Sequence, residues 1–228
     1  MLNPEGTRKT KNECNAGGGV QVLILGIGNL LWADEGFGVR AVEELHRTYE
    51  FPDNVKLLDG GTQGLYLLDH VTSADILVIF DAVDYGLEPG TMVLREDADV
   101  PSFLGAKKMS LHQTGFQEVL ASAELLGKAP AHLFLIGVQP VELEDYGGSL
   151  RPRVKAQIPP AMEAAGGYLA RHGIEARRRA QALPESVTLA GEHVRMSRYE
   201  ADRPGEDEAC RTGDARVLAM SFEAGATS

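Results

Sequence analysis

Three side chains of the kinds that bind divalent metal ions, Glu35, Asp81 and His112, lie at the borders of predicted strands and helices. Glu35 belongs to the glycine-rich segment from Gly26 to Val39, which directly follows an apolar run, and Asp81 ends the strand-like run 75–81. Open α/β sheets build their sites at such strand ends. Two carboxylates and one imidazole suit a borderline ion such as zinc or nickel and leave coordination positions open. The trio is therefore predicted to be both metal-binding and catalytic.

Each of the three residues also has a plainer structural role. Glu35 in a first helical turn would complement the helix dipole, Asp81 could cap a turn, and His112 could be a surface histidine at a helix start. In a flavodoxin-like strand order, however, the first and third strands are neighbours, which would bring Glu35 and Asp81 to one crevice. The joint pattern favours the metal site.

The elements that must position these residues follow from the spacing of apolar side chains. Short β-branched runs predict strands, and apolar residues at three- and four-residue spacing predict helices, the first of which Asp34 is expected to cap. Their order predicts a three-layer, doubly wound α/β fold of phosphorylase/hydrolase-like kind, with a mostly parallel five-stranded sheet and helices on both faces. The segment 101–108 is expected to be a loop. Strands are expected at 20–25, 55–58, 75–80, 91–96 and 132–138, and helices at 36–49, 65–71, 113–126 and 159–172.

The 228 residues, 43% of them hydrophobic, suffice for one domain with tails. Residues 1–19 are expected to be a flexible N-terminal segment and residues 20–176 the α/β domain. Residues 177–228 have few large apolar side chains and are expected to be a largely flexible C-terminal extension. Within it, 187–189 and 194–196 could add a hairpin.

The composition excludes several classes of partner. A net charge of −11 argues against nucleic acid and anionic membranes. The two cysteines, Cys14 and Cys210, lie in polar segments, which rules out a disulfide framework and a multi-cysteine zinc site and suits a reducing cytoplasm. No stretch approaches the ~20 apolar residues that span a bilayer. We expect a soluble cytoplasmic monomer.

Other catalytic and binding signatures are incomplete. Gly26 and Gly28 after a strand, with Asp59 at the end of the next, suggest a dinucleotide site, but the third glycine of that fingerprint is replaced by Leu31. Tight turning at the strand end explains these glycines as well. The sequence has no His-Glu-x-x-His and no Gly-x-Ser-x-Gly. A hydrolytic site here would use metal-bound water or a metal-held substrate.

Five motifs follow one another along the chain: Gly26-Ile-Gly-Asn29, Asp34-Glu35-Gly36-Phe37-Gly38-Val39, Asp59-Gly-Gly-Thr62, Asp81-Ala82 and Ser110-Leu-His112-Gln113. Together they resemble the nickel-iron hydrogenase maturation endopeptidases, peptidase family M52. The resemblance covers about residues 20–173, with the motifs in the family's order, and implies that residues 20–176 are a peptidase domain. It implies a peptide hydrolase of the aspartic or metal-dependent type that removes the C-terminal tail of the hydrogenase large subunit precursor after nickel insertion. Carried over by motif, Glu35, Asp81 and His112 would bind metal, and Asp59 would help to recognise the substrate.

The resemblance also implies where the metal comes from. Nickel carried by the precursor would be the recognition element, with zinc or another divalent ion possible at the same residues. The alternative function is a nickel-binding chaperone or adaptor that engages the large subunit without cutting it.

Overall fold

A computed structural model describes residues 19–105 and 111–203, without the side chains of residues 102, 103, 105 and 111–114. Its main sheet has five strands in the order β3-β1-β4-β6-β5. Four are parallel, and β5 runs antiparallel to β6 at one edge. This confirms the predicted mostly parallel sheet, with the first and third expected strands as neighbours. The strands are β1 (Val22–Ile27), β3 (Val55–Gly61), β4 (Ile76–Ala82), β5 (Met92–Glu96) and β6 (His132–Val138).

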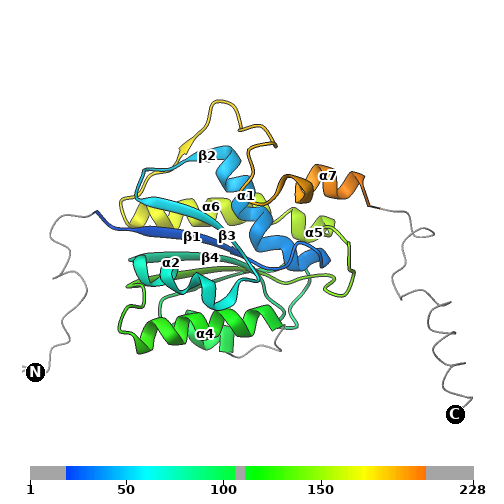
Figure 1. The fold of residues 1–228 in the computed structure, drawn as a ribbon. Coiled ribbons are helices and arrows are strands. Elements are labelled where there is room, and N and C mark those ends of the chain that lie inside the picture. Colours follow the sequence, from blue (N-terminus) through cyan, green and yellow to red (C-terminus); the bar gives the residue numbers. More distant parts are fainter. Residues whose placement is uncertain (1–18, 106–110, 204–228) are drawn as a thin grey trace, which may run out of the picture.

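Helices cover both faces of the sheet, as expected (Figure 1). On one face α1 and α6 bury a core that includes Ile24, Phe80 and Ile136 of the central strands. On the other face α2, α3 and α4 bury a second core around Leu25 and Ile79. Both faces of the central strands are therefore apolar, as in parallel sheets generally. The helices are α1 (Phe37–Thr48), α2 (Leu68–Ser73), α3 (Asp99–Gly105), α4 (Leu111–Leu125), α5 (Pro152–Lys155), α6 (Ile158–Arg171) and α7 (Met196–Ala201), with short 3-10 turns η2 (Ala33–Gly36), η3 (Gly64–Leu67) and η4 (Glu192–Val194).

Two helices occur where none was expected from the sequence. The segment 101–108 was expected to be a loop, but α3 extends to Gly105 because Val100 and Leu104 bury their side chains in the second core. Residues 106–108 lie outside the described residues. The short helix α5, with Pro152 in its first turn, buries Val154. No helix in the described part of the chain is long and apolar enough to cross a membrane.

The C-terminal segment differs most from its prediction. Residues 177–203, expected to belong to a largely flexible extension, follow a defined path along α1, with β7 (Arg177–Arg178) pairing antiparallel with β2 (Tyr49–Glu50). Partly buried Leu189 and Met196 pack against the first core. The hairpin at 187–189 and 194–196 does not form, because Val194 ends η4 and Met196 begins α7. Residues 1–18 and 204–228, including both cysteines, lie outside the described residues.

Candidate functional site

Glu35 and Asp81 lie at the carboxyl ends of two neighbouring parallel strands. Asp81 is the second-last residue of β4 and is 2% exposed, while Glu35 is half-buried in η2, the turn that leads from β1 into α1. The registers of β1 and β4 pair Gly26 with Phe80, which places the two strand ends side by side. The two strand ends that carry Glu35 and Asp81 are therefore neighbours, as the strand order predicted, while a crevice between them stays a prediction.

Two glycines hold Glu35 close to these strand ends. A Cβ on Gly38 would lie 2.1 Å from the carbonyl oxygen of Phe80 and 2.3 Å from that of Ile27, so the start of α1 rests directly on β4 and β1. Gly28, at φ +134°, would place a Cβ 1.8 Å from the carbonyl oxygen of Glu35. The chain itself fills the space beside Gly28 that a nucleotide phosphate would need, which supports tight turning as the reason for these glycines.

His112 is the second residue of α4, a helix that begins two residues earlier than expected. One turn later, a Cβ built on Gly115 would lie 3.3 Å from the Cα of Gly64, so the two backbones are in close contact. Gly64 follows the carboxyl end of β3. The start of α4 is therefore at the same edge of the sheet. Side chains two residues apart in a strand point to the same face, so Asp81 shares a face with Ile79. Ile79 packs in the core that α4 covers, and Asp81 therefore lies on the α4 side of the sheet.

The three-residue metal site itself stays a prediction. The side chain of His112 lies outside the described residues, so the distances from its ring to the two carboxylates are not defined. Among the side chains that the structure describes, no group of three or more His, Cys, Asp and Glu could hold a metal ion. The expected trio needs the imidazole of His112 to be complete.

Asp59 lies on the other face of the sheet. Its register partner is Gly26, which also pairs with Phe80, and Phe80 faces α1. Burial, followed by the negative charge of Glu43, raises the pKa of the Asp59 carboxyl group, while the backbone N–H of Gly61 and the charge of Arg40 act in the opposite direction. Asp59 therefore borders α1 and is separated by the sheet from the side on which Asp81 lies.

Asp34 has a role that the sequence did not predict. It makes no capping hydrogen bond to η2 or α1 and is completely buried. Its carboxylate instead accepts hydrogen bonds from the backbone N–H groups of Val141, Glu142 and Arg151, at 2.8, 2.9 and 2.6 Å. Hydrogen bonds to a charged acceptor are stronger than neutral ones. Asp34, which directly precedes Glu35, thus joins the loop 139–151 to the segment that carries Glu35.

Gln139 stabilises the loop on the other side of Asp81. Its buried side chain accepts hydrogen bonds from the backbone N–H groups of Tyr85 and Leu87, at 2.9 and 3.1 Å, and donates one to Asp84 at 2.9 Å. Burial and the Asp81 carboxylate raise the pKa of Tyr85 to about 12. The Tyr85 hydroxyl close to Asp81 therefore stays protonated at neutral pH.

A shallow hollow adjoins this edge of the sheet. Its volume is about 360 Å³, and the rings of Trp32 and Tyr146 meet there edge to face, with 5.2 Å between centroids. Trp32 comes from the segment that leads to Glu35, and Tyr146 comes from the loop 139–151. Carboxylates line the hollow, so it favours positively charged groups. Its lining residues are Trp32, Glu142, Glu144, Asp145, Tyr146 and Arg151.

Comparisons with known proteins place the chain among hydrogenase maturation proteins. The family model described as "Hydrogenase maturation protease" matches residues 39–167. The hydrogenase expression/formation protein HupD of Thiocapsa roseopersicina is 64% identical over 198 residues, which are 87% of this chain and 90% of that protein. The hydrogenase 2 maturation protease of Escherichia coli K12 is 44% identical over 158 residues, 69% of this chain and 95% of its own.

Among solved structures, the hydrogenase maturating endopeptidase HybD from E. coli has a TM-score of 0.67 at 41% identity. The match covers 99% of HybD but only 71% of this chain. The fold is therefore shared with this protease, while this chain carries additional residues. Residues 177–203 lie beyond the segment that the family model matches.

Proposed function

Because this chain belongs to the family of hydrogenase maturation proteases, we propose that it removes the C-terminal tail of a nickel-iron hydrogenase large subunit precursor after nickel has been inserted. The observation that carries the proposal is the placement of Glu35 and Asp81 at the adjoining ends of β1 and β4, with the start of α4 at the same edge. Carboxylate and imidazole groups suit a borderline divalent ion. Nickel in the precursor would be part of the substrate, held mainly by the precursor and contacted by Glu35, Asp81 and His112.

The chain's own groups would orient the scissile region rather than attack it covalently. The sequence offers no serine elbow, and Cys14 and Cys210 lie in polar terminal segments. Asp81 is buried at the carboxyl end of β4, near the protonated hydroxyl of Tyr85. Glu35 is half-buried, and the hydrogen bonds of its neighbour Asp34 to the loop 139–151 hold it in place. We therefore propose that the enzyme depends on its carboxylates and recognises the metal ion that its substrate carries. Two cysteines in polar segments favour a reducing cytoplasm as its location.

Recognition through the metal supplies specificity without a long peptide groove. A precursor without nickel would lack the ion that the two carboxylates and the imidazole contact, and it should remain uncut. Asp59, on the α1 face, would act at a distance from the metal, in line with a role in substrate recognition. The partner is a folded precursor whose C-terminal segment reaches the edge of the sheet.

The test mixes purified enzyme with nickel-loaded and nickel-free precursor and follows the mobility shift of the large subunit. We expect cleavage of the loaded precursor only, and none with Glu35→Gln, Asp81→Asn or His112→Ala. Asp53→Asn, an exposed acid before the amino end of β3, is the matched control and should cleave normally. Retained cleavage in two of the three site variants contradicts the assignment of the site.

The same assay separates the other functions and metals. Enzyme dialysed against a chelator should still cleave loaded precursor. Failure of the dialysed enzyme with recovery on adding zinc would instead indicate a resident catalytic ion. Stable binding of the precursor without any mobility shift, under all these conditions, would favour the adaptor function.

A further inference from the structure

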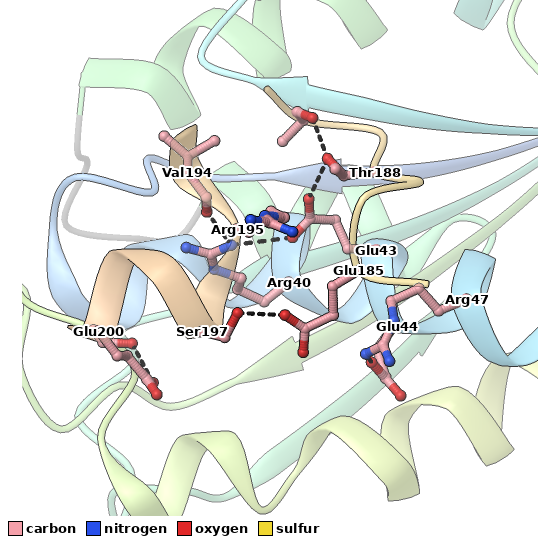
Figure 2. Close-up of polar contacts among 12 residues, drawn as sticks. Arg40, Glu43, Glu44, Arg47, Glu185, Thr188, Val194, Arg195, Ser197 and Glu200 are labelled. Carbon is pink, nitrogen blue, oxygen red and sulfur yellow. Dashed lines mark hydrogen bonds and ion pairs between the residues drawn. The ribbon is translucent and has the colours of Figure 1, made fainter. Parts of the chain in front are cut away.

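Residues 177–203, which we call the strap, run along α1 in the direction opposite to the helix. They leave β7 at the end of α1, and each later contact is made to an earlier part of the helix. Figure 2 shows the last two of these contacts, at Glu43 and Arg40. The contacts, from the end of α1 to its start, join Arg179 N to Thr48 O at 2.9 Å, Leu183 N to Arg47 O at 2.9 Å, Thr188 Oγ1 to Glu43 Oε1 at 3.3 Å and Arg40 Nη1 to Val194 O at 2.5 Å.

This path brings α7 to the end of the molecule where α1 begins, which is the carboxyl edge of the sheet. Figure 1 shows α7 and α5 together at that end, and Lys155 of α5 donates a hydrogen bond to Glu200 of α7 at 2.9 Å. The strap therefore reaches the surroundings of Glu35, although it begins at the far end of α1.

Two polar contacts join the end of the strap to the loop 139–151. Glu200 accepts a hydrogen bond from the Ser149 hydroxyl at 2.8 Å. The Nη2 group of Arg203 donates to both carboxylate oxygens of Asp145, at 3.1 and 2.9 Å. Arg151 donates to the same carboxylate at 2.8 Å. The Asp145 side chain is only 8% exposed, so these charge-assisted contacts are partly shielded from water.

The loop is joined in turn to the segment that carries Glu35. Besides the three bonds to Asp34, the N–H of Gly147 donates to the carbonyl oxygen of Leu31 at 2.8 Å, and Tyr146 contacts Trp32. Such loops are the least stable parts of a fold unless other groups hold them. The loop is therefore attached both to the strap, through Ser149 and Asp145, and to the segment that carries Glu35.

We propose that Glu200 and Arg203 are positioning residues for the mouth of the enzyme, by which we mean the segment Leu31–Glu35 and the loop 139–151 beside it. They hold the loop 139–151 against the segment Leu31–Glu35 and so keep Tyr146 and Trp32 in the arrangement that receives the precursor. The proposal rests on the proposed function only for its effect on cleavage. Its structural part, the restraint of the loop by the strap, does not depend on what the enzyme cleaves.

The chain contains one tryptophan, Trp32, and this residue reports on the loop directly. We expect Arg203→Ala to make Trp32 more accessible to acrylamide quenching and to shift its emission to the red, with little change in Tm. The double variant Arg203→Ala with Glu200→Gln should show a larger change. Arg203→Lys keeps the charge and should restore part of the protection. The matched control is Arg198→Ala in α7, because Arg198 pairs with Asp202 of the strap itself.

Cleavage kinetics add the functional part of the test. Since an ordered loop avoids an entropic cost on binding, Arg203→Ala should raise KM for loaded precursor roughly three- to tenfold while kcat changes by less than about twofold. Unchanged Trp32 quenching in both Arg203→Ala and the double variant overturns the proposal. If Arg203→Ala does not fold, Glu200→Gln alone decides in the same way. Because the quenching measurement uses no substrate, its failure is distinct from a failure of the proposed protease activity.

Discussion

The body of the molecule, residues 20–176, and the strap, residues 177–203, are stabilised by different interactions. The body buries two apolar clusters, one on each face of the sheet. Within the described residues the strap has no fully buried side chain, and it is attached largely through charged groups and backbone carbonyls. Apolar burial contributes most of the stability of a domain, whereas exposed ion pairs contribute little each. The body should therefore fold without the strap, and the strap should act on the shape of the mouth.

The largest effect is expected at Asp34, where body and loop meet. Asp34→Ala removes a fully buried carboxylate and leaves three partly buried backbone N–H groups without their acceptor, where each such group costs about 1–3 kcal/mol when water cannot reach it. We expect a loss of roughly 3–6 kcal/mol in the free energy of unfolding, measured by urea denaturation, and loss of cleavage. Asp34→Asn retains an acceptor oxygen and should lose less. A change of under about 1 kcal/mol in Asp34→Ala would contradict the role of this carboxylate.

A substitution in the apolar body comes next. Ile79 on β4 is fully buried, so Ile79→Ala should lower stability by roughly 2–5 kcal/mol through lost burial and a cavity. The matched substitution in the strap is Val187→Ala, at a position 43% exposed, which should change stability by less than about 0.5 kcal/mol. Equal losses at the two positions would remove the distinction between body and strap.

This distinction also explains what the sequence could predict. The central strands, α1 and α6 were predicted because their apolar residues recur with the period of the element, and Ile79 or Leu45 faces the core for that reason. The edge that carries Glu35 and Asp81 followed from the strand order. The strap was missed because its few apolar residues show no period, and its partners on α1 lie more than a hundred residues earlier.

The role of Asp34 could not be predicted for a related reason. An acid just before a helix has the local pattern of a cap, and nothing near it in the sequence indicates partners at Val141 and Arg151. The helix α3 falls in a segment that was expected to be a loop; Pro101 and Gly105 are poor helix formers, but burial of Leu104 outweighs them. Polar contacts between distant residues leave no periodic signal, so these features needed the structure.

Truncation after Gly191 should have a smaller effect than either substitution in the body. It removes the carbonyl oxygen of Val194 that Arg40 contacts, the Met196 packing and the whole of α7. Every buried hydrophobic residue of the described chain lies before residue 177 and is retained. We expect cooperative melting with roughly 1–3 kcal/mol lost, a raised KM and increased Trp32 quenching. Loss of cooperative melting would show that the strap is part of the folding unit.

The smallest expected effect concerns His46 on α1, where the strap passes. Burial of the ring, and then the positive charge of Arg179, lower the pKa of His46 from its ordinary 6.5, and Glu43 acts in the opposite direction. Between the lowered pKa of the folded state and pH 6.5, the unfolded chain therefore binds a proton that the folded chain does not. Stability should fall as the pH drops from 6.5 through the folded pKa, and His46→Gln should abolish this part of the slope.

The same histidine tests whether the strap lies on α1 in solution. An NMR titration should find the pKa of His46 below 6.5 in the full chain and closer to 6.5 in Arg179→Ala, because the variant removes the repelling charge. Arg178→Ala, at the neighbouring exposed position, is the control and should leave the pKa unchanged. An identical pKa in the parent and in Arg179→Ala would mean that the strap does not stay against this part of α1, and the path that brings Arg203 to Asp145 would then lose its starting point.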